Sequence, residues 1–174
     1  VAVALNGENA LRAVEDDPPD LVLLDVMLPD IDGSLVTSQV KQKTQIIRDK
    51  WGVPHIKAKN ADDAYFALGF SVAQDRLLQM ELQRRLAKGE LAQILGADLL
   101  PVDKMFRTLM LRHRAESYLA EAESINPDAL RFLDAFIEGI NYFINTGALP
   151  VEYKLLGYTP QPFTRLDSIA VIGF

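Results

Sequence analysis

Residues 73–89 decide the main element of the fold, and they read Ala-Gln-Asp-Arg-Leu-Leu-Gln-Met-Glu-Leu-Gln-Arg-Arg-Leu-Ala-Lys-Gly. Apolar residues recur near helical spacing in and before this stretch, at Leu68, Val72, Leu78 and Leu82. Polar side chains take the other positions, at Asp75, Arg76, Gln83, Arg84 and Arg85. Asn60 or Asp62 can cap the first turn, and Gly89 can end the last. The pattern predicts one long amphipathic helix between Asn60 and Gly89.

Four further helices are predicted after it. A short one runs from Glu90 to Leu95 and stops at Gly96, and a second covers residues 102–121. The expected core of the second consists of Phe106, Leu109, Met110 and Leu119. Asn126 before Pro127 begins a third helix that ends at Gly147, with Leu130, Leu133, Phe136, Ile137, Ile140 and Phe143 facing inward. Thr164 and Asp167 form a capping box for the last helix.

A β-hairpin is predicted from Gln45 to Ile56, around a turn at Trp51 and Gly52. Pro54 lacks a backbone donor, which favours an edge position for the second strand. The expected fold is therefore mainly α with a small β contribution.

Charge divides the chain into two parts. Of the 18 basic and 24 acidic residues, positions 1–42 hold two basic and eight acidic ones, so the remaining 16 and 16 balance. This break predicts two units, residues 1–33 and 44–174, joined by a junction at 34–43. Neither unit has the basic excess of a nucleic-acid binder. The chain has no cysteine, which excludes disulfides and thiolate nucleophiles.

The first unit reads as strand, helix and strand, with a buried strand at Leu21–Val26 and Asp25 near its carboxyl end. Two stretches within residues 1–33 resemble the middle of a response-regulator receiver, which has a flavodoxin-like βαβ fold. They are Asn-Gly-Glu-Asn-Ala-Leu at 6–11 and Pro-Asp-Leu-Val-Leu-Leu-Asp-Val-Met-Leu-Pro-Asp-Ile-Asp-Gly at 19–33. The resemblance implies that Asp25 corresponds to the phosphoacceptor, with Pro29 and Gly33 also matching. The family's upstream acidic pair and later hydroxyl and lysine residues have no counterpart, so we expect Asp25 not to be phosphorylated.

The second unit resembles the penicillin acylase family at three motifs. These are Arg-Asp-Lys-Trp-Gly-Val-Pro-His-Ile at 48–56, the stretch at 73–89, and Leu-Pro-Val-Glu-Tyr-Lys-Leu-Leu-Gly-Tyr-Thr-Pro-Gln-Pro-Phe-Thr at 149–164. The resemblance implies the α-segment of an N-terminal-nucleophile hydrolase with an αββα fold, acting on linear amides such as penicillins, cephalosporin side chains or acyl-homoserine lactones. It also implies calcium in the complete enzyme.

In that family the nucleophile and the oxyanion hole belong to a β-segment. The acyl-pocket side chains and the acidic calcium ligand follow on the helix that begins at Asp167, beyond Phe174. We therefore assign no catalytic, cofactor-binding or metal residue to this chain, and expect it to be inactive alone.

Other chemically capable residues favour structural roles. His55 lies in the hairpin, and His113 lies on a predicted solvated helix face. Neither forms a recognisable triad motif with Ser71 or Ser117. Arg84, Arg85 and Lys88 are expected on a solvated face or in ion pairs with Glu81 and Glu90. Buried ion pairs are expected from a second charged set, Arg48, Asp49, Asp75 and Arg76.

Three hypotheses follow. The chain is an acylase segment that awaits its β-segment, a non-catalytic signalling remnant with a passenger segment, or two units joined artificially. No stretch is apolar and long enough to cross a membrane, and no signal peptide is recognisable. Localisation stays open, because the family includes periplasmic and secreted members.

Overall fold

The computed structural model describes residues 21–23, 34–37 and 44–172. A sheet of four strands lies in the order β1 (Leu21–Leu23), β2 (Ser34–Thr37), β3 (Gln45–Arg48) and β4 (Pro54–Lys57), and each pairs antiparallel with the next. The predicted hairpin is confirmed as β3 and β4, with Arg48 opposite Pro54. Within the described sheet β4 is an edge strand, as Pro54 indicated.

The parallel pairing expected in the first unit involves a strand at residues 1–5, which lies outside the described residues, so that pairing stays a prediction. β1 lies inside the predicted stretch Leu21–Val26, but it pairs antiparallel with β2. Only ten residues separate the two strands, and a parallel crossover needs a dozen or more. Asp25, the preceding strand and helix, and most of the predicted junction lie outside the described residues.

Helix α2 (Ala61–Lys88) confirms the long helix, and both of its ends follow the predicted caps. The Asn60 side chain accepts from the Asp63 amide, and Gly89 ends the helix at φ 65°. The buried face differs from the prediction: it consists mainly of Phe66, Ala67, Phe70, Ala73 and Leu77, whereas Leu68 is 39% exposed. α2 bends at Arg76, so one regular helical period cannot describe its whole length.

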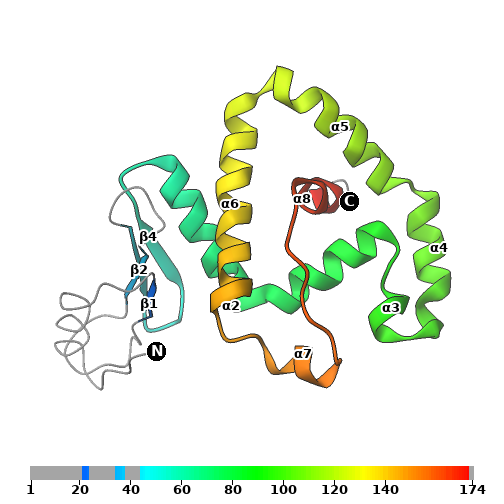
Figure 1. Ribbon diagram of the computed structural model, residues 1–174, viewed down its shortest axis with the longest axis horizontal. Coiled ribbons are helices and arrows are strands. Elements are labelled where there is room, and N and C mark those ends of the chain that lie inside the picture. Colours follow the sequence, from blue (N-terminus) through cyan, green and yellow to red (C-terminus); the bar gives the residue numbers. More distant parts are fainter. Residues whose placement is uncertain (1–20, 24–33, 38–43, 173–174) are drawn as a thin grey trace.

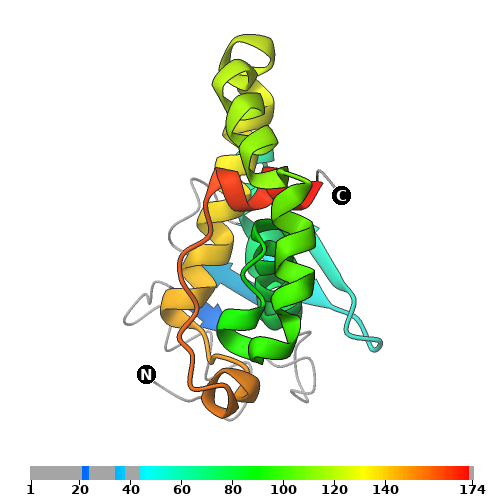
Figure 2. The same cartoon turned by 90° about the vertical axis from the view of Figure 1, so that its right-hand side faces the viewer.

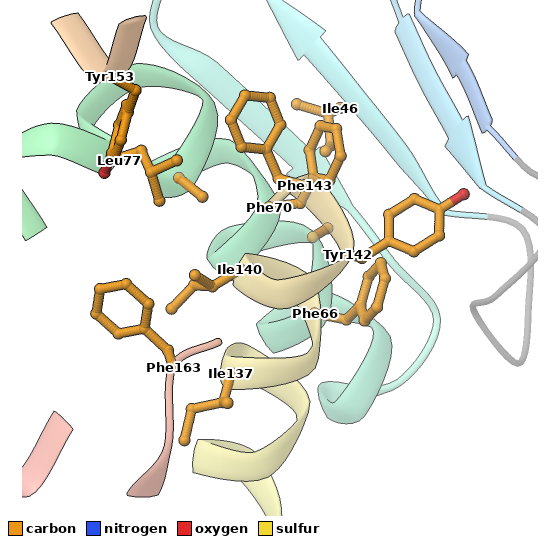
Figure 3. Packing of buried hydrophobic residues seen from close by; sticks show 12 residues of the cluster. Ile46, Phe66, Phe70, Leu77, Ile137, Ile140, Tyr142, Phe143, Tyr153 and Phe163 are labelled. Carbon is orange, nitrogen blue, oxygen red and sulfur yellow. The ribbon is translucent and has the colours of Figure 1, made fainter. Parts of the chain in front are cut away.

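Helix α6 (Pro127–Thr146) crosses α2 at close range, and the two form the centre of the fold (Figure 1). Asn126 accepts from the Ala129 amide, which confirms the predicted start. Glycines allow the approach, because a Cβ on Gly139 would lie 2.0 Å from the Phe66 carbonyl oxygen. Figure 3 shows the core that results; its buried members include Ile46, Phe66, Phe70, Leu77, Ile137, Ile140, Tyr142, Phe143, Tyr153 and Phe163.

The predicted helix at 102–121 is wrong as a single element. It consists of α4 (Leu100–Thr108) and α5 (Leu111–Ile125), separated by Met110 at φ 55°. Leu109 and Met110 lie at this break and are about half exposed rather than in the core. The break turns α5 back towards the C-terminal helix, where Ala115 packs with Ala170.

Short elements make up the rest of the helical structure in the described residues: α3 (Ala92–Leu95), a 3-10 turn at Ala97–Leu99, α7 (Val151–Leu155) and α8 (Arg165–Ile172). Residues 158–164, which we call the strap, run from α7 across α2 to α8 (Figure 1). α8 contacts α2, α5 and α6, and Figure 2 shows it between them from the side. Two helices at the core therefore hold a sheet at one end and α8 at the other.

Candidate functional site

Two polar junctions on α2 bring the three sequence motifs together. The first, here called the hairpin junction, consists of Arg48, Gly52, Gln74 and Asp75. The Arg48 guanidinium donates to the Gly52 carbonyl at 2.8 Å, to Asp75 Oδ2 at 3.0 Å and to Gln74 Oε1 at 2.7 Å. A planar guanidinium that fills several acceptors fixes direction as well as charge. The junction therefore ties the motif at 48–56 to the motif at 73–89.

The hairpin turn has its own polar network. Asp49 accepts from the amides of Trp51 and Val53, and its other oxygen lies 3.2 Å from His55 Nε2. The hydrogen bond with His55 is the main reason that the pKa of Asp49 lies below its ordinary value. His55 is mostly exposed, so its described contact stabilises the turn.

The second, the strap junction, consists of Glu81, Arg84, Arg85, Lys88, Phe163 and Asp167. Arg84 lies at its centre and is 3% exposed. It donates to the carbonyls of Gln161 at 2.9 Å and Pro162 at 3.2 Å, and its guanidinium lies 4.2 Å from the centre of the Phe163 ring. Arg84 thus joins α2 to the strap, 77 residues away in sequence.

Glu81 compensates the buried positive charge. Its carboxylate is fully buried and pairs with Arg84 and with Arg85 Nε, the latter at 2.5 Å. Arg85 also lies over the Tyr158 ring at 4.6 Å. The predicted ion pairs with Glu81 are confirmed, but the alternative of a solvated face was wrong, because the strap covers this side of α2. Glu90 contributes its backbone carbonyl rather than its carboxylate.

Asp167 connects the strap junction to α8. Lys88 Nζ lies 2.5 Å from its Oδ1, and Thr164 donates from both its amide and its hydroxyl to Oδ2. The Asp167 amide donates back to Thr164, which confirms the capping box. Burial raises the pKa of Asp167, but the bonds from Lys88 and Thr164 and the nearby Arg84 outweigh burial and hold the pKa below its ordinary value.

Helix α6 holds the same region from the other side. Asn141 exchanges two hydrogen bonds with the backbone of Phe163, at 2.7 and 2.9 Å. Asp134 binds the Arg165 guanidinium in a bidentate pair at 2.6 Å. The start of α8 is therefore fixed by polar contacts, while Ala170 near its end packs with Ala87 of α2 and Ala115 of α5.

The remaining candidates do not assemble a catalytic group. Ser71 and Ser117 each donate to the carbonyl four residues earlier, at Ala67 and His113, as helical serines commonly do. His113 is exposed, 3.7 Å from Glu116. The parts of the chain that the structure describes contain no group of three potential metal-ligating side chains and no helix suited to spanning a membrane.

An open pocket of about 450 Å³ lies where the end of α2 meets α4 and α5. Phe106, Met110 and Leu111 form its apolar wall. Its basic side chains already have partners: Arg107 donates to the Gly89 carbonyl, and Arg112 pairs with Glu116. The pocket is a scaffold surface rather than an assembled site.

Sequence reasoning missed that Arg84 and Arg85 are buried. The available signal was local: Glu81 precedes them by three and four residues, the spacing at which helical side chains meet. The expected buried pairs also need correction, because Arg48 and Asp75 do pair but Asp75 stays 38% exposed. Arg76 is exposed, and Asp49 serves the turn.

Two family models match the chain. The penicillin amidase model matches residues 43–174, and the response regulator receiver domain model matches residues 1–53. Among curated relatives, penicillin acylase 2 proenzyme of Pseudomonas sp. (strain SE83) is 42% identical over 154 residues, 88% of this chain and 20% of the relative. Penicillin G acylase of Escherichia coli is 31% identical over 76% of this chain and 16% of the relative.

An acyl-homoserine lactone acylase QuiP, from Pseudomonas syringae pv. tomato, is 32% identical over 81% of this chain and 17% of the relative. The chain therefore spans a fifth or less of the length of these relatives. A solved structure of thermostable penicillin G acylase from Alcaligenes faecalis superposes with a TM-score of 0.64 at 26% identity, over 78% of this chain and 72% of that chain. Since one family model covers most of the chain and its three motifs meet on α2, the chain belongs to the penicillin amidase family.

Proposed function

We propose that this chain is the scaffold segment of an amide hydrolase whose nucleophile comes from a β-segment of the same precursor. The observation that carries this proposal is the convergence of the three family motifs on α2 through Arg48 and Arg84. The relatives it matches are acylases of which it spans 16–20%. Neither Ser71 nor Ser117 bonds a histidine side chain, which supports a nucleophile from elsewhere.

In the proposed enzyme the N-terminal serine or cysteine of the β-segment attacks the amide carbon, and its own α-amine acts as the general base. Preset donors of the β-segment stabilise the tetrahedral oxyanion. In the proposed enzyme this chain contributes no reacting group and instead fixes the position of other elements. Its strap junction fixes the start of α8, the helix that in this family leads to the acyl pocket.

The β-segment is also the proposed partner of the exposed apolar side chains. Large apolar residues are about half exposed or more along α4 and α5 and at the hairpin tip: Met105, Leu109, Met110, Tyr118, Trp51 and Val53. Where exposed apolar side chains adjoin one another, they often mark a surface that another segment covers. A surface of this kind fits a segment that packs against it in the complete enzyme.

The proposed substrates are linear amides of the penicillin, cephalosporin side-chain or N-acyl-homoserine lactone type. Calcium is proposed for the complete enzyme only. The described residues provide no cluster of carboxylates for such an ion, so we assign it no ligand from them and no step.

The test is hydrolysis of a chromogenic phenylacetyl amide and an acyl-homoserine lactone by this chain, with and without a β-segment in trans. We expect release of product only in the combined sample. Equal hydrolysis by the chain alone would contradict the proposal, and so would an inactive complex that purifies as a stable pair. Replacement of the β-segment's first residue by alanine is the matched control.

A second candidate function rests on the receiver model match at residues 1–53. In it the first unit is a signalling remnant, with Asp25 as phosphoacceptor. Magnesium needs more than one carboxylate to support this transfer, and the resemblance identifies none besides Asp25. We expect an unchanged intact mass after incubation with acetyl phosphate and magnesium; a gain of one phosphoryl group at Asp25 would establish the candidate.

A further inference from the structure

Helix α2 changes direction at its middle, as Figure 1 shows where it passes behind α6. The backbone of Arg76 has φ −139° and ψ 20°, outside the helical range, while helix continues on both sides. The helix therefore consists of two helical halves, residues 61–75 and 77–88, joined at one residue.

The local sequence does not account for this bend. Sharp bends usually occur at proline, at glycine and serine, or where a side chain interferes with the ladder. Residues 61–88 contain no proline, and the nearest glycine and serine, Gly69 and Ser71, are at least five residues away. Gln74, Leu77 and Leu78, which flank the bend, are all good helix formers. The residues next to the bend therefore give no local reason for it.

The hairpin junction meets α2 at the bend. Arg48 binds Gln74 and both oxygens of Asp75, the two residues immediately before Arg76. Its other contact is the Gly52 carbonyl in the hairpin turn. The sheet thus holds the last turn of the first half through one rigid, forked side chain.

The two halves carry different parts of the molecule. The first half packs on α6 through Gly69 and contacts the sheet. The second half carries Glu81, Arg84 and Lys88 and so holds the strap and α8. A change of angle at Arg76 would move the strap junction relative to the hairpin.

We infer that Arg48 sets the bend of α2 and makes the hairpin junction a conformational lock between the sheet and α8. The exposed part of this region is the hairpin turn, where Trp51 is 78% exposed and Val53 is half exposed. Release of Arg48 leaves the angle to the contacts of α6, which packs on Gly69 and binds the strap through Asn141, so the range of bend angles widens. The inference holds for this chain whether or not the proposed hydrolase activity is found.

The absence of cysteine allows a direct measurement of the bend. Two spin labels are placed at Ala61→Cys and Gln83→Cys, both exposed positions on α2, one in each half. A straight helix of 22 residues spans about 33 Å, and a bent one is shorter. Double electron–electron resonance on the otherwise native chain should give one narrow distribution below that value.

Arg48→Met in the labelled chain should broaden the distribution roughly twofold. Asp75→Asn keeps the size of the side chain, removes the charge and should act in the same direction; it serves if Arg48→Met does not fold. Arg112→Met, which removes an arginine from the exposed pair with Glu116, is the matched control and should leave the distribution unchanged. An unchanged distribution in folded Arg48→Met or Asp75→Asn, judged by helical circular dichroism, would overturn the inference.

Discussion

Gly69 of α2 faces the backbone of Phe136 of α6 so closely that a Cβ built on it would lie 1.9 Å from the Phe136 carbonyl oxygen. The reciprocal contact, Gly139 against Phe66, has nearly the same spacing. These two contacts set the separation of the helices that organise the core. The larger core side chains around the two glycines pack at the distance that this separation sets.

Gly69→Ala should therefore destabilise the chain, although alanine favours an open helical position by about 1 kcal/mol over glycine. Backbone atoms must move to admit the methyl group, at a cost of about 1–3 kcal/mol or more. Urea unfolding followed by circular dichroism measures the difference. A free energy of unfolding that stays equal or rises in both Gly69→Ala and Gly139→Ala would show that the helices separate easily.

Glu81→Leu should lower the free energy of unfolding by about 3–5 kcal/mol, because it leaves the charges of Arg84 and Arg85 buried without their carboxylate. Glu116→Leu is the matched control. It also removes a helical glutamate that pairs with an arginine, but the pair is exposed and should contribute at most about 1 kcal/mol. Similar losses in the two variants would contradict the buried role of Glu81.

Arg84→Lys keeps the charge but should still destabilise the chain by about 1–3 kcal/mol. An ammonium group cannot lie flat on the Phe163 ring while it donates to the carbonyls of Gln161 and Pro162. Hydrogen exchange at the backbone amides of the strap should be faster in this variant than in the native chain. Arg112→Lys, at an exposed site, should change neither measurement.

The stability of the chain should depend on Asp167 at acidic pH. Its pKa is lowered in the folded state, so its ionised form stabilises the fold above its unfolded value of about 3.9, and this contribution is lost as the pH falls through the folded pKa. The difference in unfolding free energy between the native chain and Asp167→Asn should be largest near neutral pH and shrink below about pH 4. A difference that stays constant down to pH 2 would exclude the ionic role.

The isolated chain should self-associate, because the side chains exposed on α4, α5 and the hairpin tip are apolar. Solution scattering over a concentration series should show a mass that rises with concentration. The double variant Met105→Lys and Leu109→Lys should reduce this rise of mass with concentration. Lys104→Glu changes the charge of the same helix but removes no apolar side chain, so it is the control for an effect of charge alone. A monodisperse monomer of the native chain at all concentrations would disprove the prediction.

The sequence by itself determined where the two central helices begin and end and where α8 begins. Asn60, Gly89, Asn126 and the pair Thr164 and Asp167 act through hydrogen bonds or dihedral angles within a few residues, so neighbouring letters suffice to recognise them. The family motifs likewise follow from residue order. These features depend on residues that are close together in the chain, so the sequence alone is enough to recognise them.

The tertiary structure alone decided the buried face of α2, its bend, the division of α4 from α5, and the burial of Arg84. Periodicity identifies a helix but not the neighbour that covers each face, and a charged face reads as solvated until its partners are known. The acceptors of Arg84 lie 77 and 78 residues away, and the arginine that holds the bend is 27 residues before Asp75. Because such contacts form only when distant segments fold together, the two junctions that define this site could not be predicted from the residues around them.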